Sequence, residues 1–273
     1  MQNKGRNIAK IVLGVSIFAT IMVYLLDVIF SHSSPFKFLW LALVISITCL
    51  ITLIKLIIDD VKDILEATQE RYIKDIAGAF DGEDRKKKSL IWAVYFFSQA
   101  KYTKSIELLK RLEEKCEKPG DYRAIFLFLA LSYANLGQDI QAIYTYEKAI
   151  KNGYGTSNIY NNLGHLYAKN QDTKQAHDNY DLAIYYDSTN VAAYYNKAQL
   201  CFKDGNRTLA LELLNKALEI NPTYRPSLTL VAVIYALEGK NDEAIAAKGK
   251  AIENGESAAS IDRLILYYKN QSK

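Results

Sequence analysis

The stretch YNNLGHLYAKNQDTKQAHDNYDLA, residues Tyr160–Ala183, decides how this chain folds. Three of its small residues, Gly164, Ala176 and Ala183, belong to sets that recur along the chain at an interval of 34 residues. The three sets are Ala130, Gly164, Ala198 and Ala232; Ala142, Ala176, Ala210 and Ala244; and Ala149, Ala183, Ala217 and Ala251. Three sets that share one period indicate a repeat array, in which one supersecondary unit is copied along the chain.

The length of the period predicts what each unit contains. A helix, a short turn and a second helix fit within 34 residues,. Two helices approach closely only where a side chain is small, so we expect the first and second helices of a unit to meet at Ala130 and its equivalents. The predicted fold class is therefore all-α.

The same residues resemble the tetratricopeptide repeat (TPR) family. The family pattern has an aromatic, Leu-Gly or Leu-Ala and then Tyr in the first helix, followed by Ala and an aromatic in the second. Tyr160–Ala183 matches that pattern, and KALEINP, Lys216–Pro222, is a typical end of a unit. The resemblance implies an α-solenoid of helix pairs whose first helices line a concave, partner-binding groove.

The period also divides the chain into units. We predict five TPR-like repeats followed by a C-terminal capping helix with an apolar stripe at Ile261, Leu264, Ile265 and Tyr268. The first repeat is divergent and has Ala93, Ser105 and Leu112 in the small-residue places. The predicted bounds are 86–122, 123–156, 157–190, 191–224 and 225–256 for the repeats and 257–273 for the capping helix.

The N-terminal part of the chain has a different composition. Ile11–Leu26 and Phe38–Ile54 contain no charged residue. Each run with its flanks reaches the length of about 20 residues that crosses the hydrocarbon core of a bilayer. We therefore predict a transmembrane hairpin over 1–58, with spans at about 8–30 and 36–58.

Basic residues predict the orientation of this hairpin. They precede the first span and follow the second, whereas the intervening loop has only Lys37: Lys4, Arg6, Lys10, Lys55, Lys62, Arg71 and Lys74. Lys and Arg are enriched on the cytoplasmic side. The sequence thus predicts an integral protein of the cell membrane with both termini and the repeats in the cytoplasm. A cleaved signal peptide is the alternative, but no small-x-small cleavage site follows the apolar run,.

A connecting helix and turn are predicted at 59–85. Apolar residues recur at three-and-four spacing from Asp59 to Phe80, and Gly78 and Asp81-Gly82 end the pattern,. This amphipathic helix either contacts the membrane surface or a partner, or it covers the N-terminal end of the repeats, which solenoids need.

Composition and motifs argue against several functional classes. The net charge is +4, and it is spread over the helices, which does not favour nucleic acid as a partner,. The three cysteines form no CxxC pair, and the three histidines, His32, His165 and His177, form no ligand spacing,. No phosphate-binding loop, GxGxxG or GxSxG motif is present,. We predict neither enzymatic activity nor a cofactor or metal.

The family resemblance also implies which residues bind the partner. The places that line the groove fall in the first helices of the two middle repeats: Asn161, Asn162, His165, Lys169, Tyr195, Asn196, Gln199 and Lys203. Asn162 and Asn196 stand where the family often uses Asn to hydrogen-bond a peptide backbone. With the lysines they would suit an extended acidic segment. A plainly solvated face would have the same polar composition.

Together these features predict a membrane-anchored cytoplasmic scaffold that binds a protein or peptide partner in the groove. A tether of this kind raises the local concentration of a recruited partner. Two alternatives remain: a regulatory receptor that senses a peptide, and a structural subunit of a membrane complex.

Overall fold

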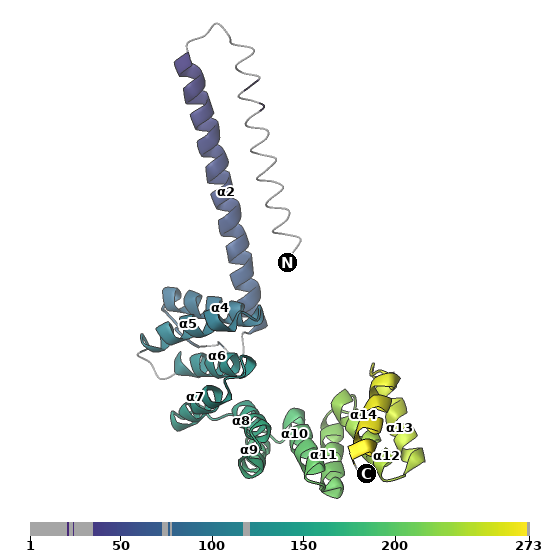
Figure 1. The fold of residues 1–273 in the computed structure, drawn as a ribbon. Helices are drawn as coiled ribbons and strands as arrows, with labels where there is room; N and C mark the ends of the chain where they lie inside the picture. Colours follow the sequence, from purple (N-terminus) through teal and green to yellow (C-terminus); the bar gives the residue numbers. More distant parts are fainter. Residues whose placement is uncertain are drawn as a thin grey trace. The chain divides into compact units, whose positions relative to one another are not determined.

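The computed structural model describes residues 21, 24, 35–72, 76, 78–116 and 121–271. Every regular element among these residues is a helix (Figure 1), which confirms the all-α class for the described part of the chain. The contacts divide the chain into two units, Met1–Ala77 and Gly78–Lys273, and each is considered by itself.

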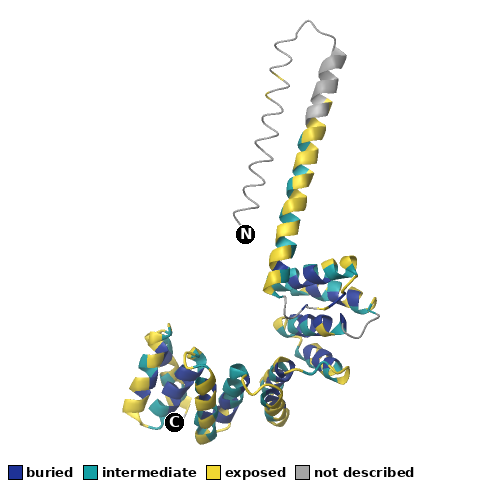
Figure 2. Ribbon diagram, turned by 180° about the vertical axis from the view of Figure 1, so that it is seen from behind, coloured by how far each residue is buried: buried dark blue, intermediate teal, exposed yellow. Residues whose placement is uncertain are grey.

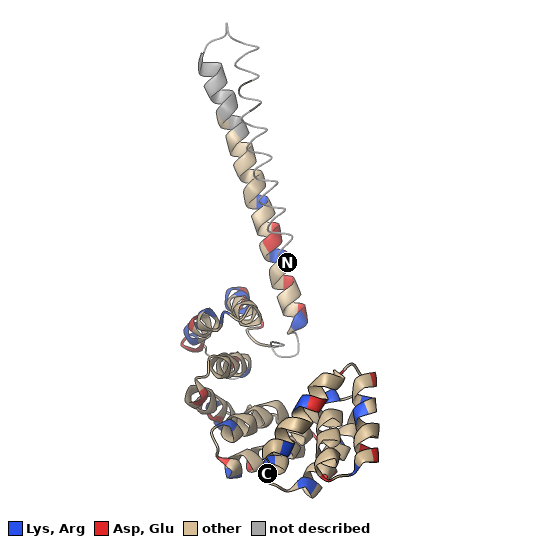
Figure 3. Cartoon of the chain, turned by 45° about the vertical axis from the view of Figure 1, so that its right-hand side comes forward, with Lys and Arg blue, Asp and Glu red and all other residues tan. Residues whose placement is uncertain are grey.

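In the first unit, α2 (Pro35–Arg71) is one helix of 37 residues. It covers both the predicted second span and the first part of the predicted connecting helix. In the part of α2 that Figure 3 colours, the charged residues lie toward the C-terminal end. The preceding turns present exposed side chains that include Ile47, Leu50 and Ile54.

The predicted membrane hairpin finds no support in these residues. In the part of the chain that the structure describes, no helix is long and apolar enough to cross a membrane. The predicted first span and the turn after it lie outside the described residues, apart from positions 21 and 24.

The second unit is a row of helix pairs followed by one further helix. The pairs are α4 (Asp84–Ser98) with α5 (Tyr102–Glu113), α6 (Tyr122–Asn135) with α7 (Asp139–Lys151), α8 (Ser157–Lys169) with α9 (Thr173–Tyr186), α10 (Val191–Lys203) with α11 (Arg207–Ile220), and α12 (Arg225–Leu237) with α13 (Asn241–Glu253). The further helix is α14 (Ala258–Gln271). The first helix of each later pair packs on its own partner and on the second helix of the pair before.

The small residues of the period lie where the two helices of a pair cross. Ala130, Ala198 and Ala232 are completely buried. Gly164 allows the closest approach: a Cβ on it would lie 2.7 Å from Cδ1 and Cε1 of the Tyr180 ring. In the α8–α9 pair a large ring of the second helix therefore packs against a small residue of the first. Figure 2 shows buried residues along the whole row of helix pairs.

The turn within each pair repeats a left-handed backbone position. Gly137, Gly205 and Gly239 adopt φ values of 73°, 84° and 75°, which glycine tolerates without a steric penalty,. Gln171 stands at the equivalent place in the α8–α9 turn with φ 65°. The next residue offsets part of that strain, because Asp172 accepts a hydrogen bond from the Gln175 backbone N–H and caps α9,.

The C-terminal helix packs differently from the helices before it. α14 contacts α12 more extensively than α13, and the ring of Tyr268 lies 5.0 Å from the ring of Phe202 in α10. Ile261 is its completely buried residue, and Lys248 of α13 pairs with Asp262 at 2.5 Å. The predicted capping helix therefore packs mainly on α12 and touches α10 through the Phe202–Tyr268 ring contact.

Candidate functional site

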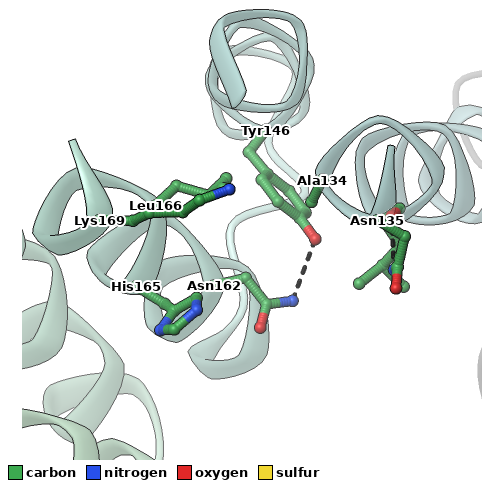
Figure 4. A pocket seen from close by; sticks show the side chains of 8 residues that line it. Ala134, Asn135, Tyr146, Asn162, His165, Leu166 and Lys169 are labelled. Atoms are coloured by element: carbon green, nitrogen blue, oxygen red, sulfur yellow. Dashed lines mark hydrogen bonds between the residues drawn. The ribbon is translucent and has the colours of Figure 1, made fainter. Parts of the chain in front are cut away.

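Two pockets in the middle of the array are copies of one arrangement. The first pocket has a volume of about 230 Å³ and is lined by Leu131, Ala134, Asn135, Tyr146, Asn162, His165, Leu166 and Lys169 (Figure 4). The second pocket has a volume of about 180 Å³ and is lined by His165, Ala168, Lys169, Tyr180, Asn196, Gln199, Leu200 and Lys203. Every residue of the second lies 34 positions after a residue of the first, so the sequence period produces a period of binding pockets.

The wall of the first pocket is a hydrogen-bonded pair of side chains. Tyr146 extends from α7 and is completely buried, and its hydroxyl accepts a hydrogen bond of 3.0 Å from Nδ2 of Asn162 in α8 (Figure 4). Burial raises the pKa of Tyr146 well above its usual range, so this hydroxyl remains protonated,. Because the amide of Asn162 uses its N–H here, its Oδ1 is left as an acceptor.

The second pocket has the same wall without that bond. Tyr180 replaces Tyr146 and is equally buried, and burial raises its pKa as well,. Nδ2 of Asn196 donates instead to Oδ1 of Asn161 at 2.9 Å. The Tyr180 hydroxyl therefore has no hydrogen-bond partner among the described residues, and it is a donor available to a ligand.

The two pockets also differ in charge. Lys169, which both share, pairs with the Asp139 carboxylate at 2.8 Å. Lys203 of the second pocket forms no ion pair with any residue that the structure describes. His165 is exposed at the boundary of the pockets, whereas His177 lies elsewhere and contacts Asp204 at 3.0 Å. The second pocket is thus the more electropositive of the two.

The structure brings together most of the predicted partner-binding residues. Six of the eight line the paired pockets: Asn162, His165, Lys169, Asn196, Gln199 and Lys203. Asn161 does not line them but hydrogen-bonds Asn196 from behind, and the Tyr195 ring lies 5.8 Å from that of Tyr224. That these residues bind a partner stays a prediction.

The sequence did not predict that two tyrosines, Tyr146 and Tyr180, form walls of the pockets. Tyr146 and Tyr180 come from second helices, whereas the family resemblance assigns the groove to first helices. Their spacing of one period was the available signal, but it fits a packing role equally well. In the described part of the chain, no three His, Cys, Asp or Glu side chains gather closely enough to hold a metal ion.

Comparison with known proteins identifies the repeats. Two family models described as tetratricopeptide repeat match residues 157–190 and 191–224. No curated protein matches the chain.

Solved structures share the fold at low sequence identity. MamA is 21% identical with a TM-score of 0.53, over 62% of this chain and 96% of that one. A tetratricopeptide repeat protein from Parabacteroides merdae is 19% identical with a TM-score of 0.57, over 66% and 70%. YrrB, described as a TPR protein with an unusual peptide-binding site, is 16% identical with a TM-score of 0.52, over 76% and 99%. Residues 157–224 are therefore tetratricopeptide repeats, and the helical array has the α-solenoid fold of proteins built from them.

Proposed function

We propose that this chain is a membrane-anchored protein–protein interaction scaffold that holds a partner peptide across the paired pockets. One observation supports this above the others: the two pockets repeat the same residue positions one period apart. A ligand that follows the row of first helices therefore meets similar groups twice. The peptide-binding site named for YrrB, whose fold is similar, agrees with this proposal.

The chemistry of the pockets suits an extended acidic segment. Oδ1 of Asn162 is available to accept a backbone N–H, and the Tyr180 hydroxyl is available to donate to a carbonyl oxygen,. Lys203 adds a cation without an internal partner, which attracts a carboxylate on the bound segment. The proposal assigns no reaction, cofactor or metal to the chain.

Membrane anchoring is the part of the proposal that rests on the sequence alone. The uncharged runs Ile11–Leu26 and Phe38–Ile54 have the length of membrane spans, and the basic residues outside them favour cytoplasmic termini,. Protease added to intact cells should leave the repeats uncut, and they should be cut once the membrane is permeabilised. Digestion from outside would refute the topology, and recovery of the full chain in a carbonate wash would refute the anchoring.

Binding by the pockets can be tested with matched variants. Crosslinked partners are recovered from native membranes with the wild-type chain and with Asn162→Ala, Asn196→Ala and Lys203→Glu combined. We expect the triple variant to lose the partners that the wild type retains. Lys174→Glu is the control, because it makes the same charge change at an exposed position of α9 outside the pockets. If the triple variant and the wild type recover the same partners, the pockets are not the binding site.

A further inference from the structure

The period of 34 residues predicts a third copy of the pocket, one repeat after the second. At this third copy, apolar residues stand in the places of the polar ones. Advancing the second pocket by 34 residues places Leu230, Val233 and Leu237 where the second pocket has Asn196, Gln199 and Lys203. The tyrosine wall becomes Leu214. Val233 is 1% exposed, although His165 at the same register is exposed in the middle of the array. Something must therefore cover this apolar copy.

The cover is α14. It packs on α12, its Ile265 and Tyr268 lie against the core that contains Leu230 and Val233, and Tyr268 reaches Phe202 of α10. Ile261, Ile265 and Tyr268 are spaced as one stripe of an amphipathic helix. This is the way in which a separate helix would dock on a groove, with the difference that α14 belongs to the same chain.

The docking of α14 is shallow. Ile261 is the one residue of α14 that is buried, whereas each other helix from α4 to α13 buries at least three. Leu266 and Tyr267 are 60% and 54% exposed. An element with so few buried contacts opens at a lower free energy than the rest of a domain.

The C-terminal half of α14 also leaves a hollow unfilled. A cavity of about 700 Å³ lies there, lined on one side by Tyr267, Tyr268 and Gln271 and on the other by residues that include Lys203 and Arg207. Neither cation forms an ion pair within the described residues. The single acidic residue of α14, Asp262, is paired with Lys248. α14 thus covers the apolar residues beneath it but provides no carboxylate to pair with Lys203 and Arg207.

We propose that α14 is a displaceable internal occupant of this surface, and that the external partner is an acidic amphipathic helix. That helix would repeat the apolar spacing of α14 and carry a carboxylate where α14 has Gln271. The carboxylate would pair with Lys203 and Arg207, which gives the partner an advantage over the internal helix. The surface is formed by α10, α11 and α12 under α14. It shares Lys203 with the second pocket, whereas Arg207 and the apolar residues under α14 line neither of the paired pockets.

The charge complementarity can be tested in the full chain. Gln271→Glu should slow amide hydrogen exchange in α14 about threefold, the effect of one partly exposed ion pair. This slowing of exchange should disappear when Arg207→Gln is also present, and it should disappear at high salt. Asn270→Glu is the control, since it adds the same charge one residue away and does not line the cavity. Equal exchange rates in Gln271→Glu and Asn270→Glu would overturn the pairing.

Displacement is tested with a labelled peptide of residues 257–273 that carries Gln271→Glu. The wild-type full chain should bind it weakly, because its own α14 occupies the surface, and Ile265→Ala with Tyr268→Ala should bind it about tenfold more tightly. Adding Arg207→Gln to the double variant should weaken its binding of the peptide, because the carboxylate loses a cation, whereas adding Asn162→Ala, in the first of the paired pockets, should leave that binding unchanged. Equal affinity of the wild type and the double variant would overturn the proposal.

A second measurement needs no substitution. In the wild-type chain, native-state hydrogen exchange should show α14 opening at least tenfold more often than α13. If α14 is protected as strongly as α12 and α13, it is a fixed part of the array and not an occupant.

Discussion

Equivalent positions of the repeat line an open pocket in the middle of the array but lie under a covering helix at its C-terminal end. In the middle, positions 162, 165 and 169 are polar or charged and line an open pocket. At the end, the equivalent positions 230, 233 and 237 are all apolar, and α14 covers them. Small residues, Gly or Ala, hold the helices together at the same places in both regions. The period thus preserves packing, whereas the residues between the small positions decide whether a surface stays open or is covered.

The largest effect is expected where a polar group is placed under the cover. Val233→Asn should lower the free energy of unfolding by about 3 kcal/mol, because valine burial is lost and an amide is left without partners. His165→Asn, at the same register in the middle, should change it by less than about 0.5 kcal/mol, because that side chain is exposed,. Urea unfolding followed by circular dichroism compares the two. Similar costs at both positions would end the distinction between open and covered copies.

A second prediction concerns the close approach behind the second pocket. Gly164→Ala should destabilise the array by about 2 kcal/mol, because the new Cβ overlaps the Tyr180 ring,. Gly249→Ala is the matched control: it lies within a helix, has no atom near the added Cβ, and should stabilise by about 0.5–1 kcal/mol,. Thermal melts of the two variants should shift in opposite directions. A stabilised Gly164→Ala protein would mean that Tyr180 moves freely.

A smaller effect separates the two tyrosine walls. Tyr146→Phe should cost about 1 kcal/mol, because Asn162 loses its acceptor,. Tyr180→Phe should cost less than about 0.5 kcal/mol, because its hydroxyl has no partner among the described residues. Denaturant midpoints of the two variants, measured side by side, decide this point. The reverse order would show that the Tyr180 hydroxyl is already engaged.

The smallest effect distinguishes the two pocket lysines. Lys169→Met should cost about 0.5 kcal/mol at low salt and nothing at high salt, since it breaks an exposed pair with Asp139,. Lys203→Met should be neutral to stability at either salt concentration. Unfolding curves at two ionic strengths test both variants. A salt-dependent loss in Lys203→Met would indicate an ion pair that leaves this cation less available to a partner.

Part of the site followed from the sequence and part did not. The resemblance to the tetratricopeptide repeat family implied that Asn162, Lys169, Asn196 and Lys203 line the groove, and they do line the pockets. Tyr195 was assigned by the same rule and instead packs on Tyr224, because the chain after α11 brings a second ring beside it. A register places a residue on a face of its helix, but the neighbouring chain decides whether that face is open.

The C-terminal helix shows the same limit. The stripe Ile261, Ile265 and Tyr268 marks its apolar face in the sequence, and that face is the one that packs. Leu264, which belonged to the predicted stripe, is 38% exposed. The stripe does not say which helix it will meet, since any apolar surface of matching size satisfies it.

The sequence by itself therefore determined the all-α class, the interval of 34 residues and the buried small residues at each crossing. These depend on short-range spacing, which a sequence states directly. Only the tertiary structure decided that Tyr146 and Tyr180 form pocket walls, that α14 packs on α12, and that the third copy of the pocket is covered. Those outcomes depend on which surfaces meet in space, and residues far apart in the chain compete for each surface with similar apolar area.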